Sequence, residues 1–110
     1  MNAAETGGPG LIWCSFPDAV SARAVAARML DEEHIACANI LGSMHSLFQW
    51  NGERGEAEET GVLFKTDAAL FDRAIDRLAE LHSYDTSAIL AWRCEAASPA
   101  TAARPAELAR

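Results

Sequence analysis

The feature that most constrains this chain is the dipeptide Asn51-Gly52, which stands between two long strand-like segments. A type I′ turn needs positive φ at both central residues, and Asn followed by Gly adopts that geometry most readily. Residues 35–50 and 53–66 are therefore predicted to pair as an antiparallel hairpin. Gly42-Ser43 interrupts the first segment, and this small, flexible pair predicts a bulge or bend within one long strand.

Two further strands and two helices are expected around the hairpin. They are strands at residues 11–16 and 88–92, and helices at residues 18–33 and 67–82. The strands are short apolar runs, too brief for helices, and the helices show apolar residues at helical spacing. Asp18 is a suitable N-cap for the first helix, and Thr66 or Asp67 can cap the second.

The resulting order, β-α-β-β-α-β, is the split βαβ of ferredoxin-like folds. It predicts an α+β sandwich in which a four-stranded antiparallel sheet carries both helices on one face. No remaining segment is large enough to cover the other face. Because the strands are partly apolar on both faces, we expect copies of the chain to associate through the uncovered one.

The segments that flank this domain, residues 11–95, differ from it in composition. Residues 1–10 contain three glycines and a proline with no hydrophobic period, so we expect a loose, disordered tail. Residues 96–110 are expected to be disordered or to form at most a short helix. Pro99 suits a helix start, whereas Pro105 should stop the helix.

Charge and cysteine content argue against several classes of function. With 9 Lys and Arg against 16 Asp and Glu, the net charge of −7 disfavours nucleic acid as a partner. No apolar run is long enough to span a membrane, so we expect no membrane partner. Three widely spaced cysteines cannot form a complete disulfide framework, and we therefore expect a reducing, cytoplasmic location.

Cysteine and histidine side chains are the candidate metal ligands, although the chain has neither a CxxC nor an HExxH motif. His34 and Cys37 lie three residues apart along a strand and so point to opposite faces. Cys14, Cys37 and His82 could meet in three dimensions as a soft site for copper or zinc. The alternative is structural, with both thiols in the core and His82 at the negative end of its helix. The spacing does not decide between these interpretations.

Lys65 is the only lysine of the chain, and it lies in an apolar run, VLFKT. A lysine on a buried strand requires either a carboxylate or an anionic ligand. Glu58, Glu59 and Asp85 are the candidate partners. Lys65 is therefore expected either in an ion pair at a subunit contact or in an anion-binding site.

Trp50, beside the turn, and Tyr84, after the second helix, are amphipathic aromatics that we expect at an interface. The glutamates within residues 53–59 form a solvated face on the simplest interpretation, and they could otherwise bind hard cations or act in acid–base chemistry. No Ser, Cys or His combination has the local frame of a nucleophilic site. The sequence therefore favours a protein that is not an enzyme and uses no organic cofactor.

Several segments together resemble the CutA divalent-ion tolerance family, over roughly residues 11–95. In chain order they are Ala36-Cys37-Ala38-Asn39-Ile40-Leu41, Ser46-Leu47-Phe48-Gln49-Trp50-Asn51-Gly52-Glu53, Lys65-Thr66 and Leu81-His82-Ser83-Tyr84. The resemblance implies a stable homotrimer of ferredoxin-like subunits whose hairpin arms complete neighbouring sheets. It also implies a link to tolerance of copper and other divalent metals.

The resemblance also implies positions for a site. Metal ligation is implied at Cys14, Cys37 and His82. The same resemblance implies an inter-subunit cleft, similar to the effector site of PII-type signalling trimers, at the following residues: Trp50, Glu58, Glu59, Lys65 and Tyr84. The chain departs from the family pattern at Gly42-Ser43, Ser83 and Ser87-Ala88, where the family favours Pro-Gly, Pro and Pro-Glu.

The first hypothesis is a non-enzymatic, cytoplasmic homotrimer that acts in metal tolerance and binds copper or another divalent metal. Threefold symmetry favours it, because one ligand per chain near the axis becomes three. The alternative is a PII-like sensor or scaffold whose clefts bind a small anion near Lys65 and signal to a protein partner that the sequence does not identify. A nucleophilic role for Cys37 is the third hypothesis.

Overall fold

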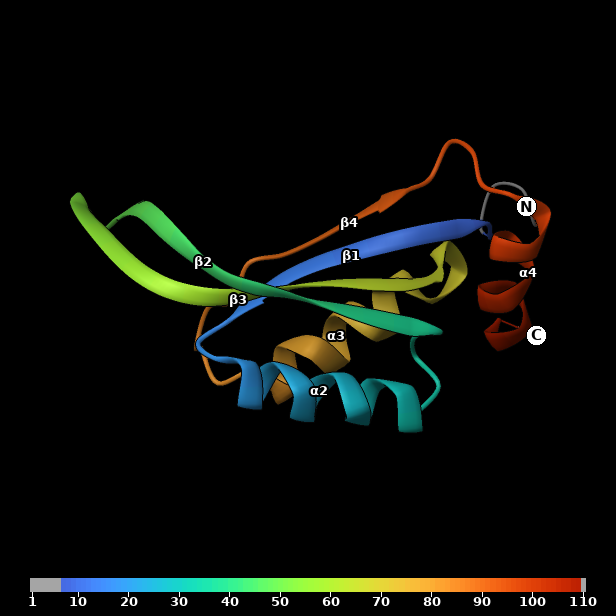
Figure 1. Ribbon diagram of the computed structural model, residues 1–110, viewed down its shortest axis with the longest axis horizontal. Coiled ribbons are helices and arrows are strands. Elements are labelled where there is room, and N and C mark those ends of the chain that lie inside the picture. The colour runs from blue at the N-terminus through green and yellow to red at the C-terminus, as the bar shows by residue number, and fades with distance from the viewer. Residues whose placement is uncertain (1–6, 110) are drawn as a thin grey trace.

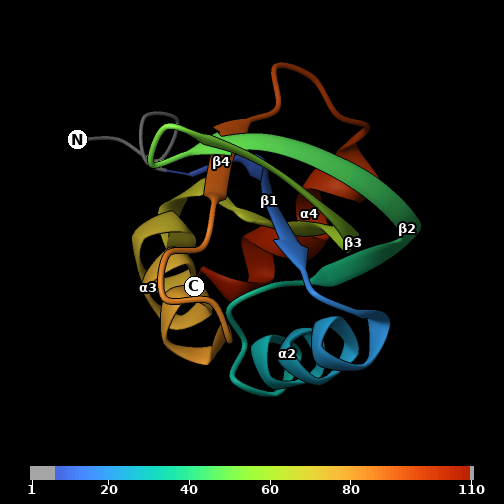
Figure 2. The ribbon, with the colours of Figure 1, turned by 90° about the vertical axis from the view of Figure 1, so that its left-hand side faces the viewer.

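A computed structural model describes residues 7–109 of the chain (Figure 1). Its elements are β1 (Pro9–Phe16), α2 (Ala19–Asp31), β2 (Cys37–Trp50), β3 (Glu53–Asp67), the 3₁₀ helix η1 (Ala68–Leu70), α3 (Phe71–Leu81), β4 (Ile89–Arg93) and α4 (Pro99–Leu108). The strands form one antiparallel sheet in the order β2-β3-β1-β4. Helices α2 and α3 lie side by side on one face of it (Figure 2). The predicted α+β class and element order are confirmed.

The hairpin has the predicted turn and the predicted bulge. Asn51 and Gly52 have φ of 51° and 78°, as a type I′ turn requires. Between the pairs Ile40–Val62 and Ser43–Thr60, β2 carries one residue more than β3, which is a β-bulge at Gly42. Strand β1 pairs with β3 only over residues 60–67. The rest of the hairpin therefore projects beyond the sheet as a two-stranded arm, at the left of Figure 1.

The core lies between the sheet and the two helices. Strand β1 alternates strictly, so every second side chain from Gly10 to Phe16 is buried. These side chains meet the apolar stripes of α2 and α3. The largest fully buried side chains of the core are Phe16, Phe64, Ile12, Met29, Ile35, Leu78 and Val62.

The other side of the sheet is apolar and largely uncovered, and we call it the open face. Strand register places Leu11, Trp13, Leu63, Leu90 and Trp92 together on it. In the single subunit Leu90 is 61 % exposed and Trp92 is 46 % exposed. Helix α4 packs against β1 and β3, but only at one end of the sheet (Figure 1). The prediction of a face that this chain cannot cover is therefore confirmed for residues 7–109.

Both ends of the domain contain more regular structure than expected. The tail was expected to reach residue 10, yet β1 begins at Pro9, because Cys94 N–H donates to Pro9 O and Ala68 N–H donates to Gly8 O. Residues 1–6 of that tail lie outside the described range. Helix α4 begins as predicted at Pro99 but continues through Pro105 to its end at Leu108. Pro105 is the buried residue of α4, so packing of its ring offsets the hydrogen bond that proline cannot make.

The second helical segment starts later than predicted. Asp67 does act as a cap, since its carboxylate accepts from Ala69 N–H over 2.9 Å, but the turn that it caps is η1. Helix α3 follows from Phe71. Asp18 caps α2 as predicted and accepts from Ser21 N–H over 2.7 Å. Among residues 7–109, no helix combines the length and the apolar character that crossing a membrane requires.

Substitution of Gly10 tests the packing of α3 against β1. In Gly10→Ala the new Cβ would clash with Cζ of Phe71, so the partly buried ring must move. Overpacking of this kind costs about 1–3 kcal/mol. Gly42→Ala is the matched control, since nothing lies within 4 Å of its new Cβ. Urea unfolding at one protein concentration should give a lower midpoint for Gly10→Ala alone, and equal midpoints would contradict the close approach.

The ion pair between α2 and α3 predicts an acid-dependent contribution to stability. Nε and Nη2 of Arg77 donate to the two carboxylate oxygens of Glu32 over 2.7 and 2.9 Å, and they lower the pKa of Glu32 from 4.5 to about 2. The pKa of Glu32 is lower in the folded protein than in the unfolded chain, so the ion pair contributes fully to the free energy of unfolding at pH values above the unfolded pKa. This contribution is lost as the pH falls toward 2. Carbon-13 NMR titration should show that Arg77→Gln raises the Glu32 pKa more than Arg28→Gln does. Equal effects of the two substitutions would contradict this account.

Candidate functional site

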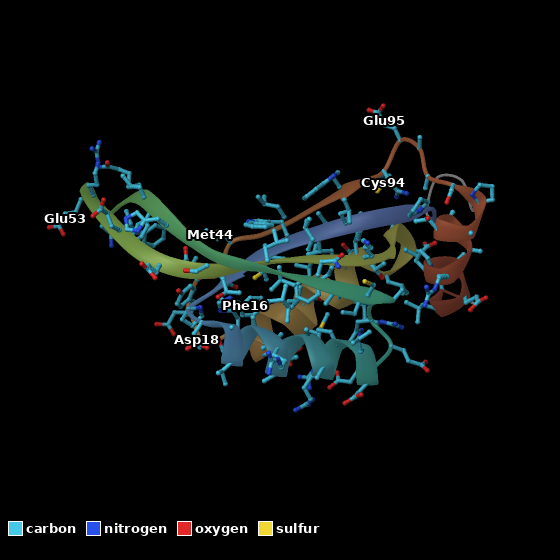
Figure 3. All side chains as sticks on the ribbon, viewed as in Figure 1. Phe16, Asp18, Met44, Glu53, Cys94 and Glu95 are labelled. Atoms are coloured by element: carbon cyan, nitrogen blue, oxygen red, sulfur yellow. The ribbon has the colours of Figure 1, made fainter. Side chains whose placement is uncertain are left out.

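The residues predicted for the site lie in separate regions of the molecule. Cys14, Glu59, His82 and Tyr84 gather with Ser15 near the end of β1, in what we call the β1-end cluster. Cys37 and Lys65 are paired across β2 and β3 near α4. Trp50 and Glu58 lie on the arm. Figure 3 marks these regions by Phe16 beside the cluster, Cys94 near α4 and Glu53 at the tip of the arm.

His82 is the centre of the β1-end cluster and is 8 % exposed. Its ring stacks on Phe16 with centroids 4.5 Å apart, and its Nε2 lies 2.6 Å from Ser15 O. Tyr84 N–H donates to Nδ1 over 3.1 Å. Since a backbone amide can only donate, Nδ1 is the acceptor and the proton is on Nε2. The ring is thus neutral with both nitrogens engaged, and its contacts are with the end of β1 rather than with the dipole of its own helix.

Glu59 connects the hydroxyl groups of the cluster. Its Oε2 accepts from the Tyr84 hydroxyl over 3.0 Å and from Ser15 Oγ over 3.3 Å. Partial burial, together with the neighbouring Glu59 carboxylate, raises the pKa of Tyr84. Tyr84 therefore keeps its proton at neutral pH and acts as a donor to Glu59.

Cys14 belongs to the core side of this region. It is fully buried, and burial, with a smaller contribution from the charge of Glu59, raises the pKa of its thiol to about 12. The thiolate is the form that binds metals and attacks electrophiles. At neutral pH Cys14 is therefore a packed, protonated thiol.

Cys37 lies on the other side of the sheet from Cys14. Cys37 pairs with Lys65, which pairs in turn with Leu11 on the open face, whereas Cys14 is one of the inward residues of β1. One subunit therefore does not bring its two predicted cysteine ligands together. Cys37 is partly buried, and the Lys65 side chain is exposed rather than enclosed as its apolar run suggested.

Of the residues predicted for a shared cleft, Glu59 and Tyr84 are in contact within one subunit, whereas Lys65 and Trp50 lie far from them. Lys65 follows Glu59 by six residues along β3, which corresponds to about 20 Å in an extended strand. Trp50, 60 % exposed, is further away at the end of the arm. Glu58 accepts from Ser43 Oγ over 3.4 Å on the same arm. A cleft that contained all of these residues would have to be formed by more than one copy.

Within residues 7–109, no group of three or more His, Cys, Asp or Glu side chains is placed to hold a metal ion. Copper and zinc sites in proteins use three or four such ligands. A single subunit can therefore supply only part of a metal site. This agrees with the lack of any chelating motif in the sequence.

Sequence reasoning missed the contribution of α4. A cavity of about 680 Å³ lies between α4 and the sheet, and its lining includes Lys65, Cys37, Ser98 and Arg104. The helix start at Ser98-Pro99 was a usable signal, and the carboxylate-free, Arg-containing segment 99–106 was another. Because Pro105 was expected to end the helix, neither signal was connected to a binding site.

Comparison with known proteins identifies the family. The family model described as CutA1 divalent ion tolerance protein matches residues 10–103. The divalent-cation tolerance protein CutA of Pyrococcus horikoshii is 38 % identical over 80 residues, which is 73 % of this chain and 78 % of that protein. Its counterpart in Thermococcus kodakarensis is 33 % identical over 79 residues, covering 72 % and 75 % of the two chains.

Solved structures agree with the sequence comparison. The periplasmic divalent cation tolerance protein CutA from Archaeoglobus fulgidus has a TM-score of 0.87 at 27 % identity, over 93 % of this chain and 99 % of that one. CutA1 from Pyrococcus horikoshii has a TM-score of 0.84 at 30 % identity, over 90 % and 96 % of the chains. With the family model spanning nearly the whole domain, these likenesses show that the chain belongs to the CutA1 divalent ion tolerance protein family.

Proposed function

We propose that this chain forms a homotrimer that binds divalent metal ions and acts in metal tolerance. The observation that carries the proposal is the open face, on which Leu90 and Trp92 remain largely exposed in a single subunit. Membership of the divalent ion tolerance family, and the names of the related proteins, support the tolerance role.

Association of several copies of the chain would bury the open face. Exposed contiguous apolar patches mark interaction surfaces, and each subunit carries the same patch. The projecting arm adds Leu47, Phe48 and Trp50, which are 62, 47 and 60 % exposed. In a single subunit the arm projects beyond the sheet, so neighbouring copies are the surface that would cover these side chains (Figure 1). The resemblance to the CutA family implies that the assembly contains three copies.

The metal site is proposed to be shared between copies. Cys37 is the predicted ligand best placed for this, because it lies on the side of the sheet that the trimer would use and its thiol is only partly buried. Copies of one thiol around a threefold axis provide the ligand number that one subunit lacks. Copper and zinc are the metals that thiolate and imidazole ligands favour.

Cys14 and His82 are also predicted metal ligands, and metal binding at either residue would require a local change in the structure. Cys14 would have to lose a proton from a thiol whose pKa is raised to about 12. His82 would have to give up one of its two hydrogen bonds. Metal binding at either residue would therefore be coupled to local opening of the β1-end cluster.

We also infer that the protein is not an enzyme. A nucleophilic site needs an activated group beside a base. In the part of the chain that the structure describes, the thiol of the β1-end cluster is Cys14, and it is buried and protonated. The hydroxyl groups of the β1-end cluster are donors to one carboxylate and are thereby held in place.

A reducing compartment, the cytoplasm, is the proposed location. Cys14, Cys37 and Cys94 are all free thiols in the structure. Disulfides form and persist in oxidising compartments, so a protein that keeps its thiols suits a reducing one. Its relative from Archaeoglobus fulgidus is described as periplasmic, so the proposed location differs from that of this relative.

A second candidate function is a PII-like sensor or scaffold that binds a small anion. The observation that favours it is the state of Lys65, whose ammonium group has no carboxylate within 4.0 Å among residues 7–109. The expected partners Glu58 and Glu59 are engaged elsewhere. A lone cation beside an apolar surface is suited to an anionic ligand.

Substitution on the open face tests the assembly. Leu90→Glu places a charge on this face without disturbing the core of one subunit, since the side chain is 61 % exposed there. Val20→Glu, on the exposed side of α2 with 79 % exposure, is the matched control. Size-exclusion chromatography with light scattering should give a dissociated Leu90→Glu variant and an intact Val20→Glu trimer. An intact trimer for both variants would contradict the role of this face.

Calorimetric titration with Zn²⁺ and Cu²⁺ tests the metal site. Wild-type protein should bind about one ion per three chains, and Cys37→Ser should weaken binding at least about tenfold, because each substitution removes three ligands from one trimer. Cys94→Ser is the control, as Cys94 is a free thiol of similar burial. Equal affinity in wild type, Cys37→Ser and His82→Ala would contradict the assignment of the site.

A further inference from the structure

We infer that the cavity between α4 and the sheet binds a small organic anion, one that combines a carboxylate with a compact apolar body. The cavity has a volume of about 680 Å³ within one subunit and is partly open to solvent, which suits a ligand of this size. The inference rests on the second candidate function and deepens it. It places the anion under α4 rather than in the cleft that the family resemblance implied.

The charge of the lining is opposite to that of the protein. The chain carries a net charge of −7, yet the described lining of this cavity has two cations, Lys65 and Arg104, and no carboxylate. Neither cation has a carboxylate within 4.0 Å among residues 7–109. Two cations without a carboxylate partner at one cavity favour an anionic ligand.

The nearby acidic side chains do not fill that role. Glu33 and Glu107 line a neighbouring pocket that shares Arg104 with this cavity. Glu95, in the loop between β4 and α4, points away from the body of the molecule in Figure 3. In a single subunit the two cations are therefore free to meet an anion, and both residues are exposed there.

The remaining residues of the lining form an apolar wall that would contact the apolar part of the ligand. Leu11 from β1, Leu30 from α2 and the buried Pro105 of α4 contribute apolar surface. Ser98 and Thr101, at the start of α4, add hydroxyl groups, and the positive end of the helix dipole is at the same place. The arrangement of an apolar wall with a few polar groups is typical of small-molecule sites.

The position of α4 explains why the cavity exists. The α4 region contributes Ser98, Thr101, Arg104 and Pro105 to the lining, and these residues face Leu11 and Lys65 of the sheet across the cavity. Pro105, which was expected to stop the helix, is instead a buried residue within it and forms part of the cavity wall.

Benzoate is a suitable probe, with benzamide as its neutral counterpart of the same shape. In ¹H–¹⁵N NMR spectra of the metal-free protein in EDTA, benzoate should shift the amides of Leu11, Ala97 and Thr101, and benzamide should not. Lys65→Gln and Arg104→Gln should each weaken benzoate binding about fivefold, the effect of losing one charge-assisted hydrogen bond. Arg54→Gln, which removes an exposed cation on the arm, should leave the affinity unchanged.

Several results would overturn this site. They are equal binding of benzamide, equal weakening by Arg54→Gln, and no shift with about 20 mM benzoate, which would saturate a site with a Kd of about 1 mM. Shifts centred on Trp50 and Tyr84 would instead place the anion in the inter-subunit cleft and retain the sensor function alone. Because the measurement is made without metal, its failure would leave the tolerance proposal standing.

Discussion

The structure depends on an apolar sheet face that one chain cannot cover. Two helices bury the inward face, and within residues 7–109 only α4 is left, which packs at one end of the sheet. Trp13, Leu63, Leu90 and Trp92 are left on the other side. The free energy that would be gained by removing this surface from water is the driving force for the association that we propose. The roles proposed for the arm and for a metal site shared between copies both depend on that association.

The alternation of side chains along a strand decides how the candidate ligands are distributed. In β1, Cys14 points inward and becomes a protonated core thiol, whereas Cys37 in β2 points toward the open side. A metal site built within one subunit would need both on one face. A site shared by copies needs only that each subunit present the same thiol to a common axis, which is why weak local motifs are compatible with metal binding in a symmetric assembly.

Much of the fold could be predicted because its signals are local. Asn51-Gly52 requires the backbone that a tight hairpin uses, and both residues have positive φ in the structure. The bulge at Gly42 and the cap at Asp18 follow from the same kind of reasoning. Pro105 could not be predicted in this way, because the burial that keeps it inside α4 comes from contacts distant in sequence. Strand Pro9–Phe16 began earlier than expected for the same reason.

The candidate site was less accessible to prediction than the fold. Residue types identified Cys14 and His82, but only the three-dimensional structure shows one thiol with a pKa of about 12 and a ring with both nitrogens engaged. Arg104 lies 39 residues after Lys65, and no pattern in the sequence connects them. Charge at a site is a property of the folded surface, so a chain with a net charge of −7 can still contain a cationic cavity.

The most direct test of the central claim is the mass of the wild-type protein by sedimentation equilibrium at micromolar concentration. An open face that only other copies can cover predicts three chains of 11.8 kDa, a particle of about 35 kDa, that persists on dilution. A stable, folded species of 11.8 kDa would contradict the account, because it would show that this apolar face is tolerated in water.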